Sequence, residues 1–307
     1  MKIAVISPLF SRSIELMKEL TTAFPDLKHN ADNLLKTKAD LIAFLQDADG
    51  AIVGREEIDD EILSACPKLK ILSRYGVGLD NLDLESMKKR GLQLGWSGGT
   101  NSNSVAEITL SLMLSCIRNL HIATALLKQH VWKVNGGSEL TGKTIGLFGF
   151  GNIAKRVVEL LSPFHCKILV CNRTHDEAEA KKYGITYASK EQILAEADII
   201  SIHLPLTPES KNLFSTEEFK AMKKSAFIIN TARGGIIDEE ALKIALKTGE
   251  IAGAGLEAFL VEPTQDWELI DLPNLICTPH LGGNSKESIL AMGYACIEHL
   301  KTFFSSQ

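Results

Sequence analysis

The chain has 307 residues, about the length of two ordinary domains that each bury a core. With 45% hydrophobic and 23% charged residues, it is not a disordered, collagen-like or disulfide-dense chain. Thirty-three Lys and Arg against 38 Asp and Glu give a net charge of -5 at pH 7, so no overall positive field attracts a phosphate backbone. Nucleic acid is therefore not an expected partner.

No export signal or membrane span is expected from the sequence. The apolar run after Met1 stops at Ser7-Pro8, too early for a secretory signal. The longest apolar stretch, residues 108–117, is half of the roughly 20 residues that a bilayer crossing needs. Six cysteines are scattered without a C-x-x-C pair, as is usual in a reducing compartment. We expect a cytoplasmic protein with no membrane partner.

Short β-branched runs alternate with longer amphipathic runs in the first third of the chain. The predicted strands are residues 3–6, 51–53, 69–73 and 92–94. Such alternation indicates parallel strands joined by crossover helices. A loop rich in Gly, Ser and Asn follows Trp96, and we place a domain boundary there.

The second part of the chain opens with one long predicted helix from about Val105 to Leu127, apolar around most of its circumference. Seven predicted strands follow, at residues 144–151, 167–172, 186–188, 198–205, 226–233, 251–259 and 275–283. The last helix, residues 286–304, is expected to return to the first domain. The predicted fold class is α/β, with two doubly wound parallel-sheet domains: a flavodoxin-like substrate domain (1–98 and 285–307) and a Rossmann dinucleotide-binding domain (99–284).

A glycine-rich turn follows the first strand of the second domain. Gly149, Gly151 and Ala154 form a G-x-G-x-x-A motif between a strand and a helix, which is the context a dinucleotide-binding loop requires. The first Gly permits the turn, and the second lets backbone N–H groups of Asn152 and Ile153 approach a pyrophosphate. A nicotinamide dinucleotide is the expected cofactor.

The end of the next strand bears on the choice between NAD and NADP. An NAD enzyme usually carries Asp or Glu there to bind the ribose hydroxyls. Here Asn172, Arg173 and Thr174 offer a guanidinium and a hydroxyl to a 2′-phosphate and no carboxylate to repel it. NADP is therefore favoured over NAD. The alternative is that Arg173 is an ordinary solvated loop residue and that NAD is preferred.

Three polar residues follow three successive predicted strands. Arg233, Glu262 and His280 would meet at the carboxyl edge of a parallel sheet, where such sheets bind ligands. Hydride transfer at a carbon bearing oxygen needs a cation for an anionic substrate and an acid/base for the proton on oxygen. Each residue alone also has an ordinary interpretation as a turn or loop residue, so the argument rests on their coincidence.

The chain resembles the D-isomer-specific 2-hydroxyacid dehydrogenase family from about Asp49 to Phe304. The motifs that carry the resemblance are residues 76–81, 105–107, 149–154, 230–239, 255–263 and 279–283. In that family the Arg of ARGG binds substrate, the His of PHLG is the acid/base and a Glu before Pro is its partner. These roles map onto Arg233, His280 and Glu262.

The resemblance assigns further positions. It implies that Val77 and Gly78 complete the substrate carboxylate site, with Arg74 and Arg55 reaching the far end of the substrate. It implies that Glu257 meets the nicotinamide carboxamide. The remaining cofactor-binding positions are Leu204, Pro205, Thr231, Ala232, Gly282 and Gly283.

The resulting hypothesis is an oxidoreductase that transfers a hydride between a nicotinamide cofactor and C2 of a small D-2-hydroxy or 2-oxo acid. Phosphoglycerate dehydrogenase and hydroxypyruvate or glyoxylate reductase are the nearest patterns. The alternative from another class is a non-catalytic dinucleotide-sensing interaction protein on the same fold. A formate dehydrogenase is disfavoured because it pairs its His with Gln, whereas Glu262 stands here.

Assembly and control are also expectations. The apolar helix 105–127 predicts a homodimer, and no metal is expected. Since the chain as given ends at residue 307, we expect no serine-binding regulatory domain and no feedback by serine.

Overall fold

The computed structural model describes residues 1–306, and the chain divides into two compact units. Unit 1 comprises Met1–Asn101 and the chain from Gly283 onward, and unit 2 comprises Ser102–Gly282. These limits lie within three residues of the expected ones at 98/99 and 284/285. Gly283 belongs to unit 1, and a Cβ on it would lie 3.3 Å from Asn101 Nδ2 in the same unit.

Unit 1 contains, within the described residues, a five-stranded parallel sheet with the strand order β2-β1-β3-β4-β5. Its strands are β1 (Ile3–Val5), β2 (Leu27–His29), β3 (Gly50–Val53), β4 (Ile71–Arg74) and β5 (Gln93–Gly95). Its helices are α1 (Pro8–Ser11), α2 (Ile14–Ala23), α3 (Lys38–Leu45), α4 (Asp60–Ala65), α5 (Leu84–Lys89) and α14 (Lys286–Ser305). This is a flavodoxin-like strand order, and the sequence predicts a flavodoxin-like domain here.

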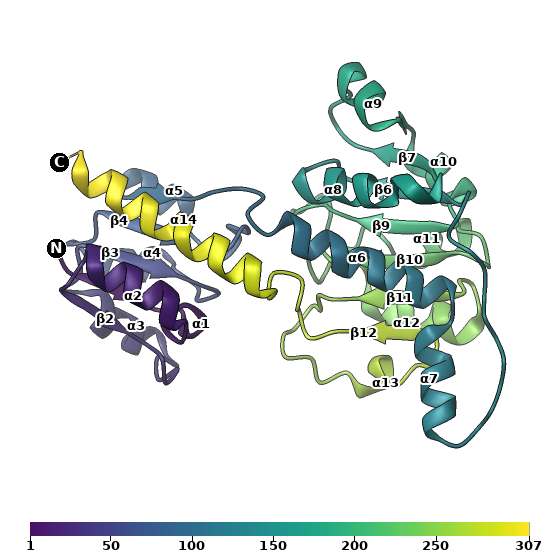
Figure 1. Cartoon of the computed structure of the whole chain (residues 1–307), viewed down its shortest axis with the longest axis horizontal. Helices are drawn as coiled ribbons and strands as arrows, with labels where there is room; N and C mark the ends of the chain where they lie inside the picture. Colours follow the sequence, from purple (N-terminus) through teal and green to yellow (C-terminus); the bar gives the residue numbers. More distant parts are fainter. Residues whose placement is uncertain (307) are drawn as a thin grey trace. The chain divides into compact units, whose positions relative to one another are not determined.

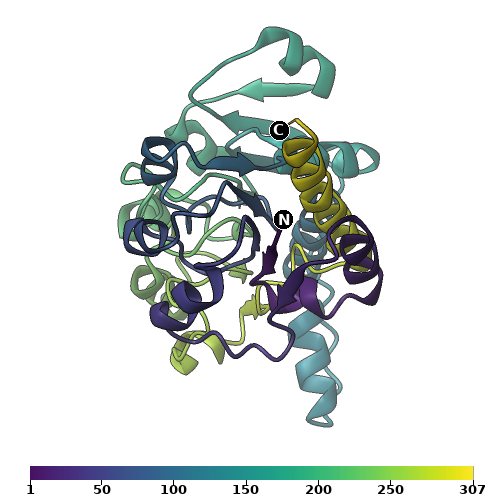
Figure 2. The ribbon, with the colours of Figure 1, turned by 90° about the vertical axis from the view of Figure 1, so that its left-hand side faces the viewer.

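Alternating side chains give the sheet of unit 1 two buried faces. Ile3 and Val5 pack with α2 and α14, whereas Ala4 and Ile6 pack with α3 and α4. The last helix, α14, packs against β4 and lies beside α2 (Figures 1 and 2). The prediction that this helix returns to the first domain is confirmed.

The sequence analysis did not predict β2. Its residues, Leu27–His29, include one strongly apolar side chain, and the strand lies at the sheet edge with every residue at least partly exposed. An edge strand buries little, so hydrophobic periodicity carries almost no signal for it.

Unit 2 contains, again within the described residues, a seven-stranded parallel sheet with the order β12-β11-β10-β9-β6-β7-β8. The strands are β6 (Thr144–Phe148), β7 (Lys167–Cys171), β8 (Ile185–Tyr187), β9 (Ile199–Ile202), β10 (Phe227–Asn230), β11 (Gly253–Leu256) and β12 (Leu275–Cys277). The helices are α6 (Ser102–Ile117), α7 (Leu120–Lys128), α8 (Asn152–Leu161), α9 (Glu177–Tyr183), α10 (Lys190–Glu196), α11 (Thr216–Ala221), α12 (Glu239–Thr248) and α13 (Trp267–Ile270), with a 3₁₀ turn at Ser162–Phe164.

The chain order reverses between β6 and β9, which are neighbours in this sheet. This reversal is the topological switch point of a Rossmann-type sheet, outside which dinucleotides bind. All seven predicted strands are present, but each ends one to six residues earlier than predicted. The residues that follow these ends form the loops at the carboxyl edge, where the candidate site lies.

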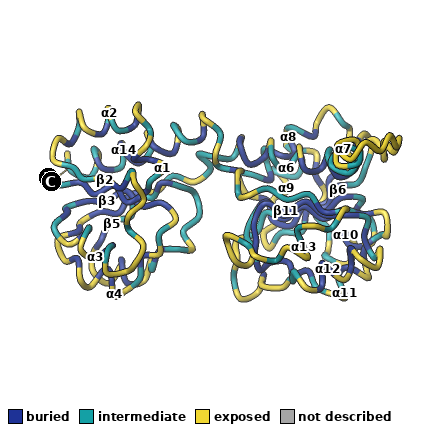
Figure 3. The backbone as a smooth tube through the Cα atoms, turned by 90° about the horizontal axis from the view of Figure 1, so that it is seen from below, coloured by how far each residue is buried: buried dark blue, intermediate teal, exposed yellow. Residues whose placement is uncertain are grey.

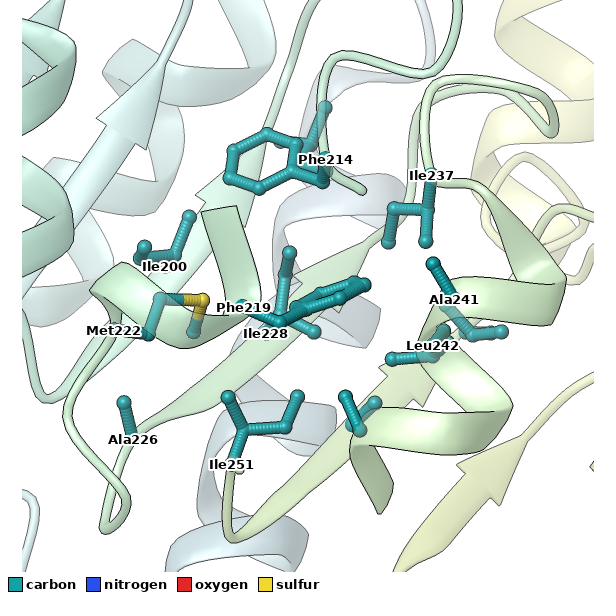
Figure 4. Close-up of a cluster of buried hydrophobic side chains, with 14 of the residues drawn as sticks. Ile200, Phe214, Phe219, Met222, Ala226, Ile228, Ile237, Ala241, Leu242 and Ile251 are labelled. Atoms are coloured by element: carbon teal, nitrogen blue, oxygen red, sulfur yellow. The ribbon is translucent and has the colours of Figure 1, made fainter. Parts of the chain in front are cut away.

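Two hydrophobic cores cover the two faces of this sheet. Ile229 and Leu147 face α6 and α8, while Ile228 faces α11 and α12. Figure 4 shows the second core, in which Phe214 and Phe219 lie close to Ile228. A sheet buried on both faces explains the continuous apolar strands of the sequence.

The prediction of one continuous helix from Val105 to Leu127 is wrong, because two helices occupy this range. α6 ends at Ile117, and α7 begins at Leu120 after Asn119, whose φ is 52°. A left-handed residue ends a helix, and Asn tolerates this conformation better than most residues. No residue of α7 is buried, as its colour in Figure 3 shows.

Across residues 1–306, no single helix is long and apolar enough to cross a membrane. α6 and α7 reach that threshold only when taken together, and they are bent by 66° at their break.

Candidate active site

The phosphate-binding turn lies at the switch point of unit 2. Gly149 follows β6 with a φ of +93°, and a Cβ on it would lie 2.7 Å from the carbonyl oxygen of His203, which follows β9. Leu204 Cδ2 would lie 3.1 Å from the same Cβ. Only glycine meets both the left-handed conformation and this close approach.

Gly151 opens the N-terminus of α8. It is the N-cap residue, no described side chain caps the helix there, and a Cβ on Gly151 would meet no atom within 4 Å. The N–H groups of Asn152 and Ile153 begin this ten-residue helix. An uncapped helix N-terminus beside open space at a switch point fits a pyrophosphate, so these residues fit a dinucleotide.

His203 lies between the turn and the core. Its Nε2 is 3.0 Å from Ser201 Oγ, and burial lowers the pKa of His203 to about 4. The imidazole is therefore neutral at physiological pH and adds no charge beside the phosphate loop.

The loop after β7 contains the residues predicted to choose the cofactor. Asn172 Nδ2 donates to the carbonyl of Thr174 at 2.8 Å, while Arg173 and Thr174 are exposed. Hydrogen bonds from Thr207 and from its own N–H, together with the charge of Arg173, hold the pKa of Glu209 below its usual range. Arg173 therefore lies within electrostatic reach of the Glu209 carboxylate.

Asn230 shapes the loop that carries Arg233. It ends β10, is 1% exposed, and its side chain accepts from the N–H of Ala232 at 3.0 Å and donates to the carbonyl of Arg233 at 2.8 Å. Thr231 is buried and its Oγ1 lies 2.8 Å from Thr109 Oγ1 on α6. The loop is therefore tied to the strand and to a helix on the sheet's face.

The loops of Arg233 and Glu262 pack directly on one another. A Cβ on Gly234 would lie 1.9 Å from the carbonyl oxygen of Phe259, so any side chain there forces the loops apart. Leu260 N donates to Glu239 Oε1 at 2.6 Å, and burial raises the pKa of Glu239. Neighbouring strands β10 and β11 thus hold the two loops in one fixed arrangement.

His280 and Glu262 form a direct pair. His280 Nδ1 lies 2.8 Å from Glu262 Oε2 and 3.1 Å from Oε1, with the two side chains 31% and 32% exposed. Glu262 also accepts from the N–H of Phe259 at 3.1 Å. A carboxylate at Nδ1 holds a proton on that nitrogen and leaves Nε2 for another partner.

Glu257, which follows β11, has its carboxylate directed to the segment around His280. Oε1 accepts from Thr278 Oγ1 at 3.0 Å and from the N–H of Leu281, and Oε2 accepts from the N–H of Gly282 at 2.6 Å. The resemblance implies that this carboxylate meets the nicotinamide carboxamide, and the structure shows that it also accepts from these three donors.

The predicted substrate residues of unit 1 lie together on the loops that follow β3 and β4. Arg74 donates to the carbonyls of Gly78 at 2.7 Å and Tyr75 at 2.8 Å, and it also contacts the carbonyl of Gly54. Trp96 Nε1 donates to the carbonyl of Val77 at 2.9 Å. Arg74 therefore shapes the turn at residues 76–78, and Arg55 directly follows Gly54 in the neighbouring loop.

Unit 2 thus brings Arg233, Glu262 and His280 onto adjacent loops at one sheet edge. The sequence analysis gave no role to four residues that hold these loops, namely Thr109, Asn230, Gly234 and Glu239, although the last three lie within the motif at residues 230–239. Asn at a strand end followed by a turn was a usable signal for one of them. Among residues 1–306, no group of three or more His, Cys, Asp or Glu is placed to hold a metal ion.

The strand order, the glycine turn and the open helix N-terminus define unit 2 as a Rossmann-type dinucleotide-binding fold. The family model described as the NAD binding domain of D-isomer specific 2-hydroxyacid dehydrogenase matches residues 110–282. The chain belongs to the D-isomer specific 2-hydroxyacid dehydrogenase family.

Relatives and solved structures agree with this family. The chain is 38% identical over 251 residues to the D-3-phosphoglycerate dehydrogenase of Mycobacterium tuberculosis, covering 81% of this chain and 48% of that protein. It is 36% identical over 269 residues to the hydroxypyruvate reductase of Thermotoga maritima, covering 86% and 87%. The structure of D-lactate dehydrogenase from Aquifex aeolicus, complexed with NAD and lactic acid, matches with a TM-score of 0.87 at 27% identity, covering 99% and 96%. The chain spans about half the length of the curated phosphoglycerate dehydrogenases it matches.

Proposed function

We propose that this protein transfers a hydride between a nicotinamide cofactor and C2 of a small 2-oxo or D-2-hydroxy acid. The observation that carries the proposal is the pair formed by His280 Nδ1 and Glu262 Oε2 at 2.8 Å, on a loop adjacent to that of Arg233. The names of the relatives support the same chemistry, with phosphoglycerate dehydrogenase, hydroxypyruvate reductase and glyoxylate reductase among them.

The dinucleotide is proposed to bind at the switch point, with further contacts from other loops. The turn at Gly149 and Gly151 and the N–H groups of Asn152 and Ile153 bind the pyrophosphate. Further cofactor contacts are proposed at Leu204, Pro205, Thr231, Ala232, Gly282 and Gly283. When bound, the reduced cofactor supplies the hydride that adds to C2 of the 2-oxo acid.

His280 is proposed to be the acid/base. Its protonated Nε2 donates a proton to the oxygen that develops negative charge on C2, and the same nitrogen takes the proton back in the reverse direction. Glu262 keeps the other ring proton on Nδ1 and stabilises the imidazolium. The two side chains are partly exposed, so protons exchange with solvent between turnovers.

Arg233 is proposed to bind the substrate carboxylate and to offset charge on the reacting oxygen. We propose that unit 1 contributes the N–H groups of Val77 and Gly78 to carboxylate binding. Arg74 shapes that turn through its bonds to backbone carbonyls, and its charge favours an anionic substrate.

We infer that NADP is preferred over NAD. Asn172, Arg173 and Thr174 lie at the carboxyl end of β7, where such folds bind the ribose 2′-hydroxyl of NAD or the 2′-phosphate of NADP. The exposed guanidinium of Arg173 and the hydroxyl of Thr174 favour the phosphate. A tenfold lower KM for NADH than for NADPH would contradict this preference.

A homodimer formed through α7 is also proposed. α7 has no buried residue, and Leu120, Leu127 and Trp132 are 53%, 55% and 84% exposed, so this segment offers apolar side chains to a second copy of the chain. A cytoplasmic location is supported by the six cysteines, which are all free.

A spectrophotometric screen tests the function. Oxidation of NADPH and NADH is followed at 340 nm with glyoxylate, hydroxypyruvate, phosphohydroxypyruvate, pyruvate and 2-oxoglutarate. We expect turnover of at least one of these acids, and a loss in the His280→Gln variant of about 10²- to 10⁴-fold with cofactor binding retained. Cofactor binding with no turnover of any acid would refute the enzymatic proposal and favour a dinucleotide sensor.

A further inference from the structure

The carboxylate of Glu257 is buried beside the catalytic loops. The residue is only 2% exposed, and its backbone N–H is held by the carbonyl of Asn230 at 3.0 Å. A buried carboxylate needs hydrogen-bond donors, since it is otherwise costly to remove from water. The identity of those donors therefore shows what this side chain does.

All three donors belong to the segment that carries His280. Thr278 Oγ1 donates from two residues before it, and the N–H groups of Leu281 and Gly282 donate from directly after it. The Glu257 carboxylate thus binds the loop on both sides of the His280 imidazole.

The backbone of this loop has features that such hydrogen bonds stabilise. His280 has a φ of +54°, a left-handed conformation that is uncommon for a residue other than glycine. The backbone N–H groups of Leu281 and Gly282, of which the second is buried, also need acceptors. The carboxylate of Glu257 supplies two of these acceptors at once.

Gly282 is shaped to receive this side chain. A Cβ on Gly282 would lie 2.5 Å from Glu257 Oε2 and 3.3 Å from Val105 Cγ2. The glycine therefore permits the close approach of its own N–H to the carboxylate. The absence of a side chain at Gly282 therefore matches the position of the Glu257 carboxylate.

We propose that Glu257 is a positioning residue that clasps residues 278–282 and thereby aims the His280 imidazole at Glu262 and at the substrate oxygen. This inference rests on the proposed function only for its catalytic consequence. Glu257 acts on the reaction through the loop, and its oxygens serve the loop before they serve any cofactor group.

The test compares Glu257→Asp and Glu257→Gln with a matched control, Asp198→Asn. Asp198 also accepts a backbone N–H, that of Thr144 at 2.9 Å, but at the opposite, amino-terminal edge of the sheet. The Asp side chain is one methylene too short to reach the three donors. The Gln side chain replaces one acceptor oxygen with an NH₂ group that faces an N–H.

We expect both Glu257 variants to lose about 10- to 100-fold in kcat/KM, because displacement of a catalytic group by about 1 Å costs that much. The apparent pKa of the acid/base in the kcat/KM profile should also move, since the His280–Glu262 pair loosens. The Kd of NADPH, measured by fluorescence, should change less than threefold. Asp198→Asn should keep the wild-type profile.

Two outcomes would overturn the proposal. A raised NADPH Kd with an unchanged pH profile would make Glu257 a cofactor ligand. A lowered melting temperature with unchanged kcat and pH profile would make it a merely structural residue.

Hydrogen exchange keeps the proposal testable if a variant fails to fold or if the protein turns over none of the acids. In the wild-type protein, the amides of Leu281 and Gly282 should be protected, although their loop lies at the sheet edge. Fast exchange of both amides would refute the clasp, whatever the activity of the protein.

Discussion

We expect replacement of Gly234 by Ala to disturb the proposed active site strongly, because the new side chain collides with the neighbouring loop. The added Cβ would lie 1.9 Å from the carbonyl oxygen of Phe259 and 2.4 Å from Leu260 N, whereas an ordinary contact begins at 3.4 Å. The loops of Arg233 and Glu262 must therefore separate by about 1.5 Å. Because a shift of about 1 Å in a catalytic group costs about 10²-fold, we expect kcat/KM to fall by at least that factor. Overpacking should also lower stability by about 1–3 kcal/mol.

The assay is NADPH oxidation with the best acid of the screen, together with thermal unfolding followed by circular dichroism. Gly136→Ala is the matched control, since Gly136 has no left-handed φ and its Cβ would find its nearest atom at 3.8 Å. The control should retain wild-type kinetics and melting temperature. A Gly234→Ala variant with wild-type kcat/KM would refute the argument that these loops must stay in contact for catalysis.

Three further changes probe the same sheet edge. For His203, the folded-state pKa of about 4 lies below the ordinary 6.5, so the neutral ring stabilises the fold above pH 6.5 and this stability is lost as the pH falls towards 4, by up to about 3 kcal/mol. The free energy of unfolding in urea should therefore change by that much less between pH 6.5 and 4 in His203→Gln than in the wild type. Parallel plots of this free energy against pH for the two proteins would contradict the prediction. Gly149→Ala should raise the NADPH Kd by at least about tenfold, because its Cβ meets a carbonyl oxygen at 2.7 Å; Gly142→Ala, at φ +72° with no atom within 4 Å, separates backbone strain from this crowding, and equal effects of the two would contradict the explanation. Thr109→Val should cost about 1–3 kcal/mol by leaving the buried hydroxyl of Thr231 without its partner at 2.8 Å, and the double variant with Thr231→Val should recover part of that loss; strict additivity would rule out a direct interaction.

The local pattern of the chain was enough to predict the order of most elements. Buried parallel strands leave continuous apolar runs, and a glycine turn between a strand and a helix is visible in any window of a dozen residues. Arg233, Glu262 and His280 were recognisable because polar residues directly follow such runs. These signals are local, since each depends on neighbours within a few positions.

The rest required the folded chain. The edge strand β2 buries too little to show a period, and the break at Asn119 depends on one left-handed residue inside an apolar run. The contact of Gly234 with Phe259 and the grip of Glu257 on Gly282 join residues 25 positions apart. Such contacts arise only when parallel strands bring the ends of distant segments to one edge, and no local pattern records which side chain meets which loop there.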